Sequence, residues 1–507
     1  MRSHDPAFVA PATVAEAIAL LADAGPEARL LAGGTNLLAD YRHSTHRPRL
    51  IVDITRISTL QSWTRAEGAW TLGPLLTVDR FIEAADLDPE VSCLRDAAAL
   101  FGGPPIRFRA TVGGNIADAS PAADLVPPLM ALGAEVALEG PGGSRTVPLT
   151  TFFTAYRRTA LAPDEVIVRI RVPLAGKGTG SAFHKFGNRE ADAIAVVSAA
   201  AWIRLENGHI ADARVALGSV APTVIRAPHV EAALRGRPAE AAAIEEAARQ
   251  VAADVTPISD IRASAEYRRA LAPVLLRRAL LDAARRATIN LGAGGRGSGF
   301  GGEARPGAAD AMPLSAIRDP QSGPLAVAFT VNGRAARVDV DPHEILLAAL
   351  RNRLGLLGAK EGCGQGDCGA CTILYDGGPA NACLILAAQA AGRRIETVEG
   401  LGKRDRLHPL QEAFVRHGAI QCGYCTPGLL MAAKGLLARV PDPTPAQVRM
   451  AISGNLCRCT GYVKIVQAIL DAAGALGASS LTLESGPAHS SGKPAPILWK
   501  GPGQLSV

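Results

Sequence analysis

The cysteines constrain this chain of 507 residues more than any other feature of its sequence. It has nine cysteines, and all but one lie between residues 363 and 459. These form two sets of four. The first set has the spacing C-x4-C-x2-C-x11-C and comprises Cys363, Cys368, Cys371 and Cys383. The second set consists of two close pairs, Cys422 with Cys425 and Cys457 with Cys459. Each set supplies four soft thiolates, which predicts two metal centres.

The spacing of the first set is typical of the loop that holds a [2Fe–2S] cluster, which needs four thiolates. Glycines interleave with its first three cysteines, at Gly362, Gly364, Gly366 and Gly369. Glycine permits the unusual backbone angles that let several N–H groups point at the sulfurs of a cluster. The second set has the ligand count for another such cluster. We therefore expect two [2Fe–2S] clusters.

Two other uses of eight cysteines compete with this prediction. Structural zinc is usually held by paired C-x2-C knuckles, whereas each set here contains a single one. A disulfide framework is typical of small secreted proteins, whereas this chain is long and its first residues carry no apolar or twin-arginine export segment. Iron–sulfur binding is favoured, and a zinc-binding scaffold stays as an alternative.

Composition and charge narrow the class of protein. The length predicts roughly three or four domains, and 48% hydrophobic residues suffice for sizeable cores. The net charge of +6 is mild, and no Lys/Arg run of the nucleic-acid-binding kind occurs. No apolar run reaches the ~18 residues of a membrane span, and the longest, residues 193–203, predicts a buried strand or helix. We therefore expect a cytoplasmic protein with no nucleic-acid partner and no membrane span.

Two glycine turns near the N-terminus point to a bound phosphate group. Residues 29–42 predict a strand, a Gly33-Gly34 turn and a helix. Residues 111–115 contain a second glycine turn, expected to follow an extended stretch, and Ser120-Pro121 then predict the start of a helix that carries Asp124. A helix that begins after such a turn presents free N–H groups to a diphosphate. A single glycine turn would be interpreted as an ordinary tight turn. Two such turns predict that one long ligand, such as a dinucleotide, is bound by both.

Four motifs within residues 1–287 resemble the FAD-binding domain of the molybdenum hydroxylases, the family of xanthine dehydrogenase, aldehyde oxidoreductases and aerobic carbon monoxide dehydrogenase. They are AGGTN at 32–36, TVGGNIADASPAAD at 111–124, GSVAPTVIRA at 218–227 and SAEYRRALA at 264–272. The resemblance implies an α+β fold of the vanillyl-alcohol-oxidase (PCMH) type and not a Rossmann fold. It also implies the residues that contact FAD: Ala32, Gly33, Gly34, Thr35, Asn36, Phe101, Thr111, Val112, Gly113, Gly114, Asn115, Asp124, Ile167 and Lys185.

This region also departs from the family pattern. The family often has Gln and Asn beside the Ile-Arg that precedes the second turn, whereas this chain has Pro105 and Phe108. The flavin subunit of 4-hydroxybenzoyl-CoA reductase carries an additional [4Fe–4S] cluster, whereas this region contains only Cys93, which we expect to be a core residue. For Lys185 an ordinary exposed lysine is the alternative. Residues 187–192 (GNREAD) match the family's loop beside the flavin and predict the entrance for the electron acceptor.

Residues 325–475 resemble the two-cluster subunit of the same family. Residues 325–342 predict a hairpin around Asn332-Gly333, and the first cysteine set is expected in a β-grasp domain like plant ferredoxin. Residues 398–475 predict helices, with the second set at their starts, and the motifs at 407–428 and 454–466 carry the resemblance. The resemblance implies that the second cluster faces a molybdenum centre, that the first faces FAD, and that Gln421 reaches toward the pterin.

These observations together predict the domain organisation. The expected segments are an FAD-binding PCMH-type domain at 1–175, the C-terminal domain of the flavoprotein at 176–287, a flexible linker at 288–324, a ferredoxin-type [2Fe–2S] domain at 325–397, a helical [2Fe–2S] domain at 398–478 and a disordered tail at 479–507. No segment is left for a molybdopterin domain. The resemblance therefore implies the electron-transfer subunit of a heteromeric molybdenum hydroxylase.

The expected partners follow from that role. A molybdopterin-binding large subunit should hold the substrate, and the acceptor should be NAD, a quinone, oxygen or another carrier. The expected assembly is a heterodimer or a dimer of heterodimers. A self-contained flavin/iron–sulfur reductase is the alternative function.

Overall fold

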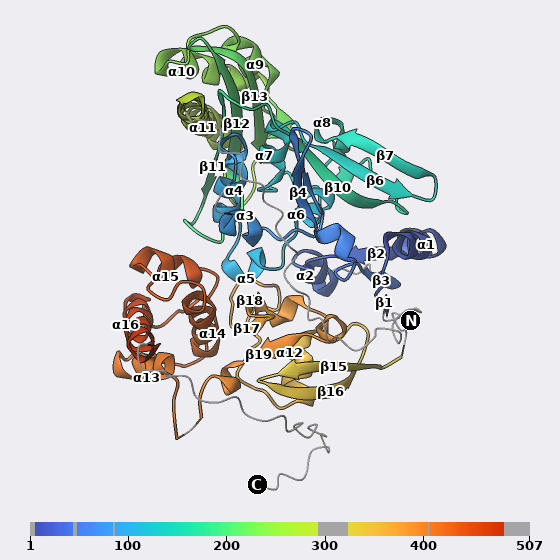
Figure 1. The fold of residues 1–507 in the computed structure, drawn as a ribbon, viewed down its shortest axis with the longest axis vertical. Helices are drawn as coiled ribbons and strands as arrows, with labels where there is room; N and C mark the ends of the chain where they lie inside the picture. Colours follow the sequence, from blue (N-terminus) through green and yellow to red (C-terminus); the bar gives the residue numbers. More distant parts are fainter. Residues whose placement is uncertain (1–5, 44–47, 85–86, 293–322, 404, 481–507) are drawn as a thin grey trace.

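The protein is a multidomain α+β structure with two modules, shown in Figure 1. The computed structural model describes residues 6–43, 48–84, 87–292, 323–403 and 405–480. We call residues 6–292 the N-terminal module and residues 323–480 the C-terminal module. They occupy the upper and lower halves of the view in Figure 1. Most of the predicted linker (288–324) and of the predicted tail (479–507) lies outside the described residues. Helix α11 (Ala265–Gly292) continues into the start of that predicted linker, and helix α16 (Val463–Ser480) continues into the start of that predicted tail.

The N-terminal module begins with two sheets and, with its helices, has the α+β character that the resemblance implied. The first is parallel, in the order β1-β3-β2, and the second is antiparallel, in the order β4-β5-β10-β6-β7. The strands are β1 (Ala7–Val9), β2 (Ala28–Leu31), β3 (Leu50–Asp53), β4 (Trp63–Ala66), β5 (Ala69–Leu72), β6 (Glu135–Gly140), β7 (Gly143–Pro148) and β10 (Val166–Pro173). Helix α1 (Val14–Ala24) precedes β2, and α2 (Leu37–His43) follows the first glycine turn as predicted. Val166 and Val168 of β10 share a core with the first sheet.

Short helices connect these strands: α3 (Asp79–Glu83), α4 (Cys93–Leu100), α5 (Pro104–Arg107), α6 (Val112–Ala117), α7 (Val126–Ala131) and α8 (Leu149–Phe152), followed by the small hairpin of β8 (Phe153–Ala155) and β9 (Arg158–Thr159). Two predictions about the second glycine turn are wrong. Helix α5 precedes it instead of an extended stretch, and Ser120-Pro121 lie in a turn while the next helix starts at Val126. Paired prolines lie in the first turn of both α5 and α7, and proline fits the first turn of a helix as well as an extended chain.

The rest of the N-terminal module is one antiparallel sheet, in the order β11-β12-β13-β14, with helices packed on it. Its elements are β11 (Thr179–Gly187), β12 (Ala195–Glu206), β13 (His209–Gly218), β14 (Ile225–Arg226), α9 (Pro228–Leu234), α10 (Ala241–Arg249) and α11. The apolar run 193–203 falls mostly in the buried strand β12. Asn207 and Gly208 form the turn between β12 and β13, both with positive φ (51° and 79°). This is the backbone that a two-residue hairpin of this kind requires.

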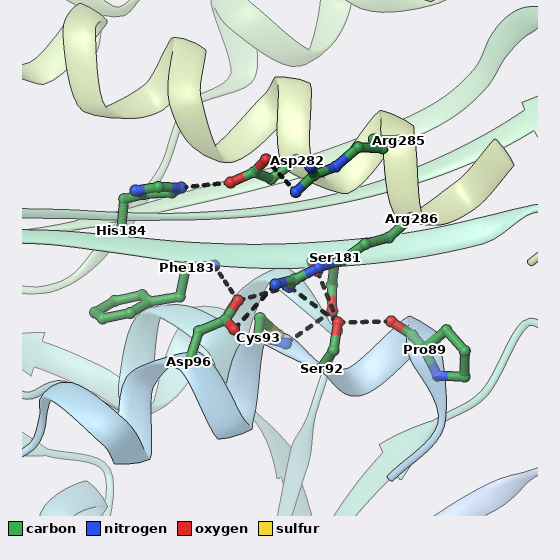
Figure 2. Close-up of polar contacts among 10 residues, drawn as sticks. All are labelled: Pro89, Ser92, Cys93, Asp96, Ser181, Phe183, His184, Asp282, Arg285 and Arg286. Carbon is green, nitrogen blue, oxygen red and sulfur yellow. Dashed lines mark hydrogen bonds and ion pairs between the residues drawn. The ribbon is translucent and has the colours of Figure 1, made fainter. Parts of the chain in front are cut away.

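A polar network fastens β11 to α4, as Figure 2 shows. Arg286 of α11 donates to Asp96 of α4 and to the carbonyl of Ser181 of β11, each at 2.6 Å. The N–H of Cys93 donates to Ser181 Oγ at 3.1 Å. Cys93 is fully buried, and burial raises the pKa of its thiol to about 12, as expected for a core residue. The network thus fixes strand β11, which carries Lys185, against helix α4, whose last residue Leu100 accepts a hydrogen bond from Lys185.

The C-terminal module combines a mixed sheet with a helical domain. The sheet has the order β16-β15-β19-β17-β18 and consists of β15 (Leu325–Val331), β16 (Arg334–Val340), β17 (Thr372–Tyr375), β18 (Gly378–Asn381) and β19 (Arg394–Glu396). The predicted hairpin at Asn332-Gly333 is confirmed, with φ of 50° and 77°. After the hairpin the chain forms α12 (Leu346–Ala348), which continues as a π-helix over Ala349–Arg353.

The region predicted to be helical contains α13 (Pro409–Arg416), α14 (Thr426–Leu437), α15 (Pro445–Ala451) and α16 (Val463–Ser480). Their apolar faces form a separate core that includes Phe414, Leu429 and Ile465. Within the described part of the chain, no helix is long and apolar enough to cross a membrane.

Candidate flavin and iron–sulfur sites

The two glycine turns of the N-terminal module are built by close packing of the chain on itself. A Cβ on Gly33 would lie 2.0 Å from the carbonyl oxygen of Arg109, in the stretch that leads into the second turn. A Cβ on Gly113 would lie 2.5 Å from Pro74 Cβ. Real Cβ atoms do not approach other atoms this closely, so both positions require glycine whether or not a ligand is bound. The first turn therefore lies directly beside the segment that carries the second, as one ligand held by both turns requires.

The second turn forms the start of α6. Thr111 caps this helix, and its Oγ1 accepts a hydrogen bond of 3.1 Å from the N–H of Gly114. Asn115 Oδ1 accepts one of 3.2 Å from the N–H of Leu125. The side chain of Asn115 thus ties the turn to the segment that carries Asp124. Local hydrogen bonds therefore bring the two predicted parts of the site together.

Asp124 and Lys185 form a buried ion pair. Lys185 Nζ donates to Asp124 Oδ2 at 2.7 Å and to the carbonyl of Leu100 at 2.9 Å. The side chains are 4% and 10% exposed for Lys185 and Asp124, so the alternative of an ordinary exposed lysine is wrong. Burial raises the pKa of Asp124 to about 6, although Lys185 opposes this rise. The second oxygen, Oδ1, is buried without a hydrogen-bond partner among the described residues.

That unsatisfied oxygen is the observation that tests the fit of FAD. A buried acceptor without a donor costs free energy, and a ligand that supplies a donor removes that cost. FAD has hydroxyl groups and a ring N–H that can donate. The residues present therefore fit a bound flavin.

The other predicted flavin contacts differ in exposure. Phe101 is half-buried at the end of α4, and Ile167 of β10 is 6% exposed within the same core. Ala32 and Thr35 are half-buried and Asn36 is exposed. Their contacts with FAD stay a prediction.

In the first cysteine set, backbone N–H groups point at the sulfurs. The N–H groups of Gln365 and Cys368 each lie 3.4 Å from Cys363 Sγ, and the N–H of Cys363 lies 3.3 Å from Cys368 Sγ. The Cys368 thiol and these N–H groups lower the pKa of Cys363 to about 5. Three of the four interleaved glycines have positive φ: Gly364 (70°), Gly366 (92°) and Gly369 (66°). This confirms the role expected of glycine in the loop.

The thiols of each set meet in two pairs. In the first set Cys363 contacts Cys368, and Cys371 contacts Cys383. In the second set the sulfurs of Cys422 and Cys459 are 3.5 Å apart, and Cys425 contacts Cys457. Two thiolates for each of two iron ions is the ligand pattern of a [2Fe–2S] cluster. The eight cysteines of the two sets all carry free thiols, so they can supply the ligands of two clusters.

The two sets differ in exposure. Cys371 and Cys383 are buried, at 3% and 1% exposed. Cys425 caps α14 as expected for a helix start, while Cys422 and Cys459 are exposed. Gln421 beside them is exposed as well. The second set therefore lies at the surface of the C-terminal module.

The two cysteine loops touch each other. The N–H of Leu456 donates to the carbonyl of Cys368 at 2.9 Å. Asn455 Nδ2 donates to the carbonyl of Gly369 at 2.8 Å and to Thr372 Oγ1 at 2.9 Å. Asn455 is 2% exposed, and the sequence did not single it out, although it stands two residues before a predicted ligand.

The short 3-10 helix that carries Cys383 of the first set also touches the first glycine turn. The position of a Cβ on Gly34 is 3.1 Å from the carbonyl oxygen of Leu384, the residue after Cys383. The first cysteine set therefore lies between the first glycine turn and the second cysteine set, and the second set lies at the surface.

Four family models match the chain. The FAD binding domain in molybdopterin dehydrogenase matches residues 3–175, and the C-terminal domain of CO dehydrogenase flavoprotein matches residues 181–283. The 2Fe-2S iron-sulfur cluster binding domain matches residues 329–392, and the [2Fe-2S] binding domain matches residues 397–470.

Similar proteins cover both modules. The xanthine dehydrogenase FAD-binding subunit of Escherichia coli O157:H7 is 37% identical over 274 residues, which is 54% of this chain and 94% of the relative. The nicotine 6-hydroxylase small subunit of Paenarthrobacter nicotinovorans is 57% identical over 147 residues, 29% of this chain and 88% of the relative.

A solved structure agrees with these matches. A chain of carbon monoxide dehydrogenase from Hydrogenophaga pseudoflava superposes with a TM-score of 0.54 at 36% identity and covers 56% of this chain and 99% of its own length. The chain therefore belongs to the molybdenum hydroxylase family of oxidoreductases and joins in one polypeptide the family's FAD-binding part and its two [2Fe–2S] domains.

Proposed function

We propose that this chain takes electrons from a molybdenum–pterin centre on a partner large subunit and passes them to FAD and then to an external acceptor. Its similarity to xanthine dehydrogenase and carbon monoxide dehydrogenase subunits supports the proposal. When bound, the [2Fe–2S] clusters carry single electrons and FAD collects two. The residues of this chain hold the three cofactors in a fixed order.

The contact between Gly34 and the carbonyl of Leu384 carries the proposal. It puts the 3-10 helix of Cys383 against the proposed diphosphate site. The second set, with Cys422 and Cys459 exposed, is free to face the partner. We therefore assign the first set to the cluster nearer FAD and the second set, with Gln421 beside it, to the cluster nearer the molybdenum centre.

The flavin-binding residues have distinct roles in this proposal. The turns at 32–36 and 111–115 hold the diphosphate, while Phe101 and Ile167 provide apolar contacts. Asp124 Oδ1 accepts a hydrogen bond from FAD, and Lys185 keeps the carboxylate charged and oriented. The domain boundaries after residues 175 and 397 belong to the proposal, supported by the ends of β10 at Pro173 and β19 at Glu396.

The acceptor and the cellular setting are further parts of the proposal. Residues 187–192 follow Lys185 on β11 and include exposed side chains, which supports their role as the entrance for NAD, a quinone or oxygen. The assembly is a heterodimer or a dimer of heterodimers. We place it in the cytoplasm because nine free thiols suit a reducing compartment.

The test is purification of the native complex, followed by cofactor analysis and separation of the subunits. We expect the complex to contain FAD, and to contain iron and acid-labile sulfide in amounts equal to each other. Turnover should occur only when the molybdenum subunit is present. Turnover by this chain alone would support a self-contained reductase instead. Zinc without acid-labile sulfide would support a scaffold protein.

A further inference from the structure

The segment 103–108, which contains α5, lies where the two modules meet. Figure 1 shows α5 at the lower edge of the N-terminal module, beside β18 of the C-terminal module. Pro105 and Phe108, the two departures from the family pattern, both belong to this segment. Their neighbours across the junction explain why these residue types occur here.

Three side chains of the segment each lie close to a glycine of the C-terminal module, although at Gly366 the side chain of Leu384 is nearer still. The distances from the glycine Cβ position are 2.3 Å for Gly378 to the Phe108 ring, 3.2 Å for Gly454 to Pro105 Cδ, and 3.2 Å for Gly366 to Ile106 Cδ1. Gly378 begins β18, Gly454 precedes the Cys457–Cys459 pair, and Gly366 lies inside the first cysteine loop. One short segment thus contacts the β-grasp sheet and both cysteine loops.

Backbone and charge reinforce this contact. A Cβ on Gly103 would lie 2.8 Å from Gly454 Cα, so the two backbones touch. The guanidinium carbon of Arg439, at the end of α14, lies 4.7 Å from the centre of the Phe108 ring. Arg439 Nη1 is 3.3 Å from Asp79 Oδ2, a carboxylate that is 6% exposed. Arg439 therefore holds the ring from the side of the helical domain.

We propose that residues 103–108 form a docking wedge that positions the first cysteine loop against the flavin site, with Ile106 and Phe108 as the positioning residues. The two prolines that begin α5 make the wedge stiff, because each fixes its own φ. Pro105 and Phe108 thus serve the contact with the C-terminal module and not the flavin ring. The inference deepens the proposed function, since it rests on the first cluster being the one that reduces FAD.

The test is the substitution Gly378→Ala in the full chain with its cofactors. The new methyl group must displace the Phe108 ring. Overpacking of this kind lowers an equilibrium constant for docking by roughly 5- to 150-fold. We expect amide hydrogen exchange in residues 103–108 to accelerate by a similar factor, and electron transfer from the clusters to FAD to slow. FAD and iron contents, measured in parallel, should match the wild type.

Two further variants complete the design. Gly474→Ala is the matched control, because no atom lies within 4 Å of its Cβ position, and it should change neither readout. Phe108→Ala combined with Gly378→Ala removes the collision but also the positioning ring, so slow exchange and electron transfer should recover in part. The wedge is refuted if Gly378→Ala behaves as the wild type, or if the double variant is as impaired as the single one. If exchange responds as expected while the wild type passes no electrons from clusters to FAD, the wedge holds and the proposed electron path fails.

Discussion

Replacing Lys185 with methionine should destabilise the N-terminal module because it leaves Asp124 buried without its cation. Lys185 Nζ lies 2.7 Å from Asp124 Oδ2, with side chains 4% and 10% exposed. Removing one partner of a buried ion pair costs about 3–5 kcal/mol of unfolding free energy. At roughly 2–4 °C for each kcal/mol in a module of this size, the unfolding midpoint should fall by about 6–20 °C at pH 8.

The loss should depend on pH in a defined direction. The pKa of Asp124 is raised to about 6 from an ordinary 3.8, so the stability this carboxyl contributes is full below about pH 4 and is lost as the pH rises through 6. Without Lys185 the pKa rises further, because the lysine is what lowers it, and the loss continues at higher pH. The difference between the two proteins should therefore be small at pH 5 and large at pH 8.

Tryptophan fluorescence during heating measures this effect. Trp63, Trp70 and Trp202 are buried in the N-terminal module and report its unfolding. The control is Arg249→Met, which breaks an ion pair of the same 2.7 Å length to Glu245, with side chains 69% and 43% exposed. An exposed pair contributes only about 0–1 kcal/mol. A midpoint for Lys185→Met no lower than for Arg249→Met, or a drop of equal size at pH 5 and pH 8, would refute the reasoning.

Three further predictions concern the cofactors. Gly114→Val should release FAD, because its Cβ would lie 2.8 Å from Thr111 Oγ1 and its methyl groups crowd the second turn; a full flavin absorbance after purification would contradict this. Cys371→Ser should leave the second cluster reducible by substrate while FAD reduction slows, whereas Cys425→Ser should stop electrons before both later centres. Rapid-mixing EPR distinguishes the two variants, and wild-type FAD reduction in Cys371→Ser would show the assigned order to be wrong. Substitutions within residues 187–192 should change the KM for the acceptor without changing FAD content, and unchanged kinetics with every acceptor would count against an entrance at this loop.

Features that depend on local chemistry were predictable from the sequence. The spacing of the cysteines set the ligand count of each cluster, and thiol pairing in the structure agrees with it. The Asn-Gly turns at 207–208 and 332–333 were predictable because few residues tolerate positive φ there. Long amphipathic segments such as α16 were predictable from their periodicity. Helix α5 was not predictable because its two prolines fit the first turn of a helix as well as an extended chain.

Only the tertiary structure decided which residues meet. Lys185 and Asp124 are far apart in the chain, and the sequence could not show that Lys185 is buried against that carboxylate. Gly33 was expected to contact FAD, and the structure shows that the atom nearest its Cβ position is the carbonyl oxygen of Arg109. The spaces at Gly378 and Gly454 exist because the two modules pack together. Local preferences depend on neighbours in the chain, whereas burial and close packing depend on neighbours in space, which are set only when the whole chain is folded.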